Sequence, residues 1–156
     1  MQAPPEIPVA IERAAISDLA TLVPLFEAYR AFYRAKPNAE AAEKFLRERL
    51  EKNQSVLFLA RDAATREPLG FAQIYPLFSS IRMVPLLLLN DLYVVPAGRR
   101  AGVARALIRA VEEFARENGT PELMLSTHVN NRTAQRVYQS AGWRRDDEFY
   151  TYLRDV

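Results

Sequence analysis

The residues at positions 99–105 combine arginines with small side chains in a way that suits an anion. Their order is Arg-Arg-Ala-Gly-Val-Ala-Arg, directly after an apolar stretch at 86–95. Glycine and alanine let a ligand approach the backbone without meeting a side chain. If a helix begins here, its first amides have no partner within the helix, and its dipole adds positive potential. A pyrophosphate therefore fits this site, with Arg99, Arg100 and Arg105 at its rim.

Known nucleotide-binding loops differ from this one. No Gly-Lys-Ser/Thr follows, so it is not a P-loop. Position 104 is Ala and position 107 is Leu, so it is not the Gly-x-Gly-x-x-Gly turn of dinucleotide-binding domains either. The plain alternative is an arginine-rich helix start that binds nothing.

Asp91 is a second candidate for a chemical role, because its carboxylate lies inside the apolar stretch at 86–95. A carboxylate there is costly unless it is paired or used. Two interpretations stay open: a base for catalysis, or a structural ion pair with a nearby arginine. His128, the single histidine of the chain, is an alternative base, although a lone histidine is more often structural or substrate-lining.

Periodicity and capping signals predict the elements that would position these residues. Ser17 is expected to cap a first amphipathic helix, kinked near Pro24. Asn38 is expected to start a second helix whose buried stripe consists of Phe45, Leu46 and Leu50. The predicted helices cover residues 19–33, 38–52, 103–118 and 132–140. The predicted strands cover residues 9–16, 56–60, 71–77, 86–95, 122–129 and 149–153. The strand at 86–95 is the most hydrophobic, so it should lie centrally in the sheet. The unit at 86–129 should form a parallel crossover.

Composition limits the class of protein. The chain has 156 residues, 49% of them hydrophobic and 26% charged, which fits one α/β domain at 8–156 behind a loose tail at 1–7. It contains no cysteine, which excludes disulfides and thiolate metal sites, and we expect no metal. The net charge is only +2, with acids interleaved among the arginines, which argues against nucleic acid as a partner. No signal peptide or membrane span is evident, so we expect a cytoplasmic protein.

Two sequence blocks carry a specific resemblance. The first is Arg99-x-x-Gly102-x-Ala104, preceded by Leu92-x-Val94-x-Pro96. It is similar to the Q/R-x-x-G-x-G/A signature of the GNAT superfamily, the Gcn5-related N-acetyltransferases. The second, Asn131-x-x-Ala134-x-x-x-Tyr138-x-x-x-Gly142-Trp143, resembles the later conserved block of that family, with Trp where Phe is commoner. The resemblance runs from about residue 9 to the end of the chain.

The resemblance implies a fold and a co-substrate. The expected fold is a mixed, mostly antiparallel sheet of about six to seven strands flanked by about four helices. The expected co-substrate is acetyl-CoA. Its pantetheine arm would pair with the backbone of Leu92, Tyr93 and Val94 almost as an added strand, and Asn131 would bind nearby. The pyrophosphate would lie on the loop that includes Arg99, Arg100, Ala101, Gly102, Val103, Ala104 and Arg105.

The resemblance also implies an N-acetyltransferase in which a primary amine attacks the thioester directly. Tyr138 would protonate the departing CoA thiolate, a suitable task for a phenol with a pKa near 10. The alternative for Tyr138 is a core tyrosine with a polar handle. Asp91 is the best candidate for the base, acting on the amine directly or through water. The acceptor amine stays open, because an aromatic substrate wall would suit many cationic amines through cation–π contacts. The expected wall consists of Tyr29, Phe32, Tyr33, Tyr75 and Phe78, with His128.

Two other classes of function remain as alternatives. A non-catalytic acyl-CoA-binding module would keep the loop at 99–105 without needing the acid, and an arginine-rich protein- or RNA-binding domain would need neither. The aromatic stretch at 149–153 could pair across a homodimer or complete the sheet within one subunit.

Overall fold

The computed structural model describes residues 7–156, so nearly all of the predicted tail at 1–7 lies outside the described residues. The chain separates into two compact parts: the first ends at Ser126 and the second begins at Thr127. No helix in the described range is long and apolar enough to cross a membrane.

A mixed sheet organises the first part. Its strand order is β1-β2-β3-β4-β5, with the first three pairings antiparallel and the last one parallel. The strands are β1 Val9–Arg13, β2 Val56–Asp62, β3 Pro68–Ser79, β4 Val84–Val94 and β5 Glu122–Met124. The hydrophobic β4 is an interior strand as expected, although β3 occupies the centre. The predicted parallel crossover is confirmed, since α3 connects the paired strands β4 and β5.

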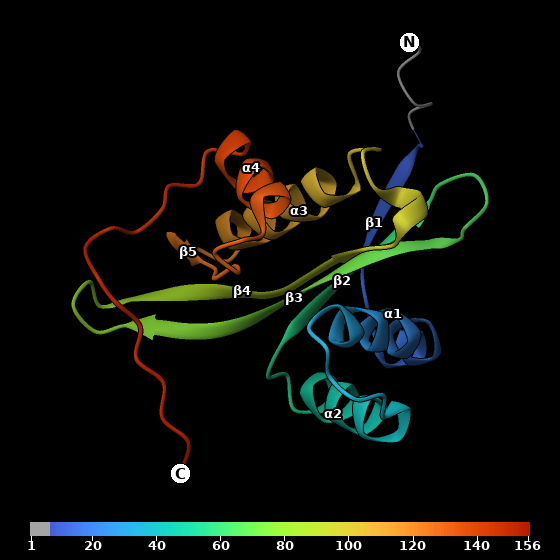
Figure 1. Ribbon diagram of the computed structural model, residues 1–156, viewed down its shortest axis with the longest axis horizontal. Helices are drawn as coiled ribbons and strands as arrows, with labels where there is room; N and C mark the ends of the chain where they lie inside the picture. The colour runs from blue at the N-terminus through green and yellow to red at the C-terminus, as the bar shows by residue number, and fades with distance from the viewer. Residues whose placement is uncertain (1–6) are drawn as a thin grey trace. The chain divides into compact units, whose positions relative to one another are not determined.

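Helices cover both faces of this sheet: α1 and α2 lie on one side and α3 on the other (Figure 1). The helices are α1 Leu19–Phe32, α2 Ala39–Glu51, α3 Val103–Glu117 and α4 Arg132–Ser140, with short 3-10 turns at Ile16–Asp18 and Pro96–Gly98. The predicted start of α2 near Asn38 is confirmed: Asn38 is the N-cap residue, and its Oδ1 accepts from the Ala41 amide at 3.0 Å. Pro24 lies inside α1.

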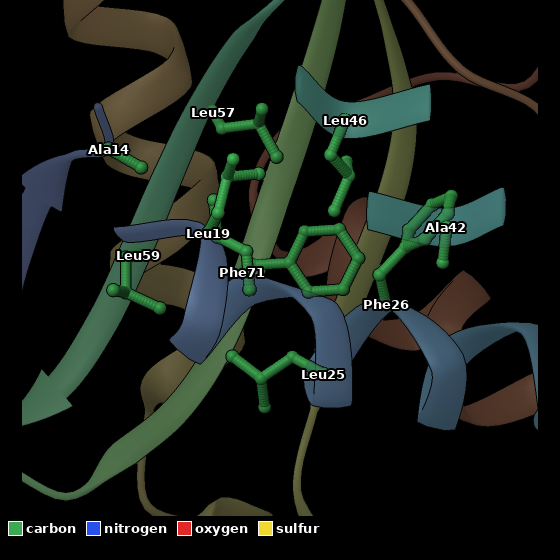
Figure 2. Close-up of a cluster of buried hydrophobic side chains, with 10 residues drawn as sticks. Ala14, Leu19, Leu25, Phe26, Ala42, Leu46, Leu57, Leu59 and Phe71 are labelled. Atoms are coloured by element: carbon green, nitrogen blue, oxygen red, sulfur yellow. The ribbon is translucent and has the colours of Figure 1, made fainter. Parts of the chain in front are cut away.

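Apolar side chains fill the space between α1, α2 and the sheet, as Figure 2 shows. Leu22, Leu46, Leu57, Leu59 and Phe71 are fully buried there. Each such side chain contributes roughly 1.5–3 kcal/mol relative to an exposed one. This cluster packs α1 against β3 and so covers the face of the sheet that lies toward α1 and α2.

Several predicted boundaries are wrong. The first strand ends at Arg13, and the N-cap residue of α1 is Asp18 rather than Ser17. The Asp18 side chain makes no capping hydrogen bond to α1; its Oδ2 accepts from the Ala15 amide at 2.9 Å, at the start of the 3-10 turn that precedes α1. The strand predicted at 122–129 is only Glu122–Met124, because its pairing with β4 stops at Leu88. Phe45, predicted to be buried, is 36% exposed.

The predicted last strand is also absent. Residues 149–153 form neither helix nor strand, and Tyr150 is 89% exposed. An alternation of aromatic and polar residues favours a strand only where a neighbouring strand completes its hydrogen bonds. The sheet in the described residues therefore has five strands, fewer than expected.

Candidate active site

A β-bulge in β4 determines which way Asp91 points. Gln73 of β3 pairs with Asp91 and the next residue, Ile74, pairs with Leu89, so Asn90 is an extra residue without a partner on β3. In a regular ladder Gln73 would pair with Asn90, and Asp91 would lie opposite Ala72, on the other face of the pleat. The bulge instead places Asp91 on the same face as Gln73, the face that α1 and α2 cover.

The Asp91 carboxylate is buried, with only 3% of the residue exposed. Its Oδ2 accepts from Gln73 Nε2 at 2.6 Å and its Oδ1 from Asn90 Nδ2 at 2.9 Å. Burial raises the pKa of Asp91, and hydrogen bonds from Gln73, Tyr29 and Asn90 oppose this only in part. The structural alternative of an ion pair is not observed, because no arginine or lysine among residues 7–156 forms an ion pair with Asp91.

Two tyrosines border this carboxylate. The Tyr29 hydroxyl lies 3.4 Å from the Asn90 carbonyl oxygen, and both burial and the charge of Asp91 raise the pKa of Tyr29. Burial and the same charge raise the pKa of Tyr75 to about 12. Both phenols are therefore neutral hydrogen-bonding groups at physiological pH.

The other aromatic residues of the predicted substrate wall are more exposed. The Tyr33 ring packs edge-on against Tyr29 and Phe32, with centroids 5.1 and 5.2 Å apart. Phe32 is 58% exposed and Tyr33 49%. Phe78 is 83% exposed and pairs with Pro85 near the tip of the β3–β4 hairpin. It lies three residues beyond Tyr75, about 10 Å along the strand. The structure thus groups Tyr29, Tyr33 and Tyr75 near Asp91 and leaves Phe78 at the hairpin tip.

The edge of β4 that faces β5 is open from Leu89 onward. The pairing with β5 covers Leu86 to Leu88 only, so no described strand pairs with the β5-facing edge of residues 89–94. This stretch includes Leu92, Tyr93 and Val94, which pair with β3 on their other side. In an antiparallel strand every second residue directs its N–H and C=O away from its partner. An extended ligand could therefore add to this edge.

The loop at 99–105 leads from β4 into α3 with an unusual backbone. Arg100 and Gly102 both have positive φ, 65° and 79°, and Gly102 is the N-cap residue of α3. No heavy atom lies within 4 Å of a Cβ built on Gly102, so the space above this backbone is open. Arg99, by contrast, turns back toward β4, where its Nε donates to the Val94 carbonyl at 3.3 Å.

Within this loop Ala101 and Ala104 are partly exposed, Val103 is buried, and Arg100 and Arg105 are exposed. The first amides of α3 thus open onto a surface with arginine on either side. This combination suits a phosphate, because unpaired helix amides and guanidinium groups both donate to its oxygens.

The remaining predicted site residues lie in the second part, residues 127–156. Asn131 is the N-cap of α4, where its Oδ1 accepts from the Ala134 amide at 3.1 Å. Tyr138 is partly buried, and its ring centroid lies 6.1 Å from that of Trp143. His128 is exposed, and its Nδ1 accepts from the Asn130 amide at 3.1 Å.

Comparison with known proteins identifies the family of this chain. The sequence matches the Acetyltransferase (GNAT) family over residues 22–143. The chain belongs to the GNAT acetyltransferase family. It is 40% identical over 146 residues to the uncharacterized N-acetyltransferase YhfO of Bacillus subtilis, covering 94% of this chain and 97% of that protein. A crystal structure described as that of a probable acetyltransferase has a TM-score of 0.89 and 39% identity, covering 94% and 97% of the two chains.

A third relative of this GNAT protein has a named acceptor. It is the D-amino-acid N-acetyltransferase HPA3 of Saccharomyces cerevisiae, 35% identical over 92 residues, which are 59% of this chain and 57% of HPA3. The family and its relatives make the chain an N-acetyltransferase. GNAT enzymes use acetyl-CoA as co-substrate.

Sequence reasoning missed two buried polar residues of this GNAT site. Gln73 binds Asp91 directly, and the Ser55 hydroxyl donates to Gln73 Oε1 at 2.8 Å. The available signal was a glutamine within the apolar stretch at 69–74, but its partner depends on the register across the sheet.

Proposed function

We propose that this enzyme transfers the acetyl group of acetyl-CoA to a primary amine of a small molecule or peptide by direct attack, with Asp91 as the base. The observation that carries the proposal is the buried Asp91 carboxylate beside the open edge of β4. The open edge is suited to the co-substrate and the carboxylate to the amine.

The amine must lose a proton before its nitrogen can attack, since an alkylammonium has a pKa near 10. A buried carboxylate is a stronger base than an exposed one, because burial raises the pKa of Asp91. Asp91 takes this proton, directly or through one water molecule. As the bond between nitrogen and the acetyl carbon forms, backbone N–H groups near Leu92 stabilise the negative carbonyl oxygen.

The thioester side needs an acid. When the C–S bond breaks, the CoA sulfur leaves as a thiolate and takes up a proton, which we assign to the Tyr138 hydroxyl. Tyr138 and Asn131 are separated by two turns and so lie on one face of α4, which supports a common role in binding this end of acetyl-CoA.

The pyrophosphate of acetyl-CoA is assigned to residues 99–105. Support comes from the open space above Gly102 and from the first amides of α3, with Arg100 and Arg105 exposed at the rim. Arg99 contributes less, because its guanidinium turns toward Val94.

The acceptor is assigned to the side of Asp91 that carries Tyr29, Tyr33 and Tyr75. Neutral phenol rings favour a cationic amine through cation–π contact, and the Asp91 carboxylate between them attracts its positive charge. Phe32, Phe78 and His128 were predicted to belong to the same wall; Phe78 could reach only the far end of a long acceptor.

Binding and turnover test the proposal separately. Acetyl-CoA at about a hundred times its Kd should stabilise the protein by about 2.7 kcal/mol, measured by thermal unfolding. No shift at millimolar acetyl-CoA would contradict the proposal. Release of CoA thiol is then followed with D- and L-amino acids, polyamines, aminoglycosides and short peptides. Binding without thiol release for any amine would instead support a non-catalytic acyl-CoA-binding module.

A further inference from the structure

The buried polar side chains of the described residues all belong to one chain of hydrogen bonds. They are Ser55, Gln73 and Asp91, which are 6%, 0% and 3% exposed. The Ser55 hydroxyl donates to Gln73 Oε1 at 2.8 Å, and Gln73 Nε2 donates to Asp91 Oδ2 at 2.6 Å. Both polar atoms of the Gln73 amide are therefore engaged, one on each side.

The sheet itself aligns these three residues. Gln73 on the central strand β3 pairs with Asp91 on β4 and with Leu57 on β2, and Ser55 lies just before β2 begins. The bulge at Asn90 completes the alignment, because it is what brings Asp91 opposite Gln73.

Stability does not account for such a chain. Apolar side chains of similar volume are often as stable as a buried polar network, or more stable. A buried carboxylate with a raised pKa lowers the stability of the native state at neutral pH. Retaining these groups in the core therefore calls for a role at the carboxylate.

We propose that Gln73, supported by Ser55, is a positioning residue for Asp91: its amide donates to the ionised carboxylate and turns over to accept from Asp91 once the carboxylate has taken up a proton. This inference rests on the proposed role of Asp91 as the base.

The chemistry of the three groups keeps a hydrogen-bond partner for both the oxygen and the nitrogen of the Gln73 amide in either state. With Asp91 ionised, the Ser55 hydroxyl donates to Oε1 and the NH₂ group donates to Asp91, as observed. With Asp91 protonated, its O–H donates to Oε1 of the reversed amide, and the NH₂ group donates to the Ser55 oxygen. A hydroxyl can both donate and accept, and a carboxamide reversed by 180° keeps its shape. The carboxyl thus stays in place while its charge changes.

Two phenols border Asp91, Tyr29 on α1 and Tyr75 on β3, and each has a raised pKa and so stays neutral through this change. The charge of Arg49 on α2 acts on Tyr75. Between pH 4 and 8 a proton taken up in this cluster therefore goes to Asp91.

The first test replaces Gln73 by methionine, which has similar size and cannot donate. In Gln73→Met the acidic limb of the pH profile of kcat/KM should move up by about one pH unit, because the hydrogen bond that Gln73 donates to the ionised carboxylate is stronger than the one it accepts from the protonated form. Ile74→Met is the matched control: Ile74 is the next residue, fully buried, and outside the polar chain. Its acidic limb should stay where it is in the wild type. An unmoved limb in Gln73→Met overturns the proposal.

The second test is milder and covers the case in which Gln73→Met does not fold. Ser55→Ala should lower kcat about threefold to tenfold and leave the KM for acetyl-CoA unchanged, and Ser55→Thr should restore kcat because it keeps the hydroxyl. Equal kcat in Ser55→Ala and the wild type, or no recovery in Ser55→Thr, overturns the role of Ser55.

A third measurement separates this inference from the proposed function. The carboxyl carbon of Asp91 is titrated by NMR, with Asp91→Asn to assign its signal, so that no turnover is needed. A higher pKa in Gln73→Met than in the wild type supports the positioning role, and an equal pKa overturns it. Wild-type thiol release by Asp91→Asn would instead remove the base role, which belongs to the proposed function.

Discussion

The Gln73 amide nitrogen lies 2.6 Å from Asp91 Oδ2, across the one place where β4 carries an extra residue. One irregularity in the backbone thus decides both the partner of the carboxylate and the face on which it lies. The next strand along the sheet, β5, stops pairing three residues before Asp91, so the carboxylate lies beside an open backbone edge.

The stability of the Asp91→Asn variant should depend on pH in a defined direction. The pKa of Asp91 is raised from its usual 3.8, so the native state holds this proton more tightly than the unfolded chain. Wild-type stability therefore falls as pH rises from about 4 through the raised pKa, then levels off. Relative to the wild type, Asp91→Asn should gain up to about 1.4 kcal/mol per pH unit in that window, roughly 3–6 °C in Tm. Thermal unfolding between pH 4 and 8 measures this, and a constant difference would contradict it.

Substitution of Gly102 should affect ligand binding more than folding. Both Gly102 and Gly119 have positive φ, 79° and 64°, and both have open space above them. Alanine at either position should cost about 1 kcal/mol in stability. Only Gly102→Ala should weaken acetyl-CoA binding, by about tenfold, because its Cβ occupies the surface assigned to the pyrophosphate. Calorimetric titration of both variants with acetyl-CoA checks this. Equal affinities of the two variants would show that the pyrophosphate does not bind over Gly102.

Arg100 should bind the phosphate end of acetyl-CoA. Arg100→Gln keeps a long side chain but loses the charge, and we expect about threefold to tenfold weaker binding of acetyl-CoA. Binding of acetyl-pantetheine, which has no pyrophosphate, should not change. Arg109→Gln is the control, since Arg109 is also exposed but lies one turn beyond Arg105 on α3. An equal loss of affinity for acetyl-CoA and for acetyl-pantetheine would show that Arg100 does not bind the pyrophosphate.

Tyr138→Phe should slow the transfer step. Without the hydroxyl the departing thiolate loses its proton donor, so kcat should fall about 10- to 100-fold with little change in the KM for acetyl-CoA. Tyr150→Phe, at a residue that is 89% exposed, serves as the control. The measurement is thiol release with a reactive amine from the panel. Unchanged turnover in Tyr138→Phe would show that another group is the acid.

Local signals predicted much of the fold. The bounds of α4 match the prediction, and α2 begins directly after Asn38, close to its predicted start, because capping and helical periodicity depend on residues within a few positions of each other. The crossover from β4 through α3 to β5 also follows from the order of the elements. The motif at 99–105 marked the start of α3 for the same reason.

Relationships across the sheet were not predictable in this way. Asp91 was identified as a costly residue in an apolar strand, but its partners Gln73 and Ser55 were not, because each lies 18 positions from the next and depends on strand register. The bulge at Asn90 leaves no local signal in the sequence. The strand expected at 149–153 failed for the related reason that a strand needs a neighbour.

The bulge at Asn90 has a second consequence, for solubility. A row of unpaired backbone groups in a sheet can accept a strand from another molecule and so begin aggregation. The stretch at 89–94 is such a row, and it is flanked by the most apolar part of the chain. An extra residue interrupts the regular spacing that a foreign strand would need, which is one of the ways natural sheets protect their edges. Asn90, which sets the direction of Asp91, therefore also hinders a strand of another protein from pairing with the open edge of β4.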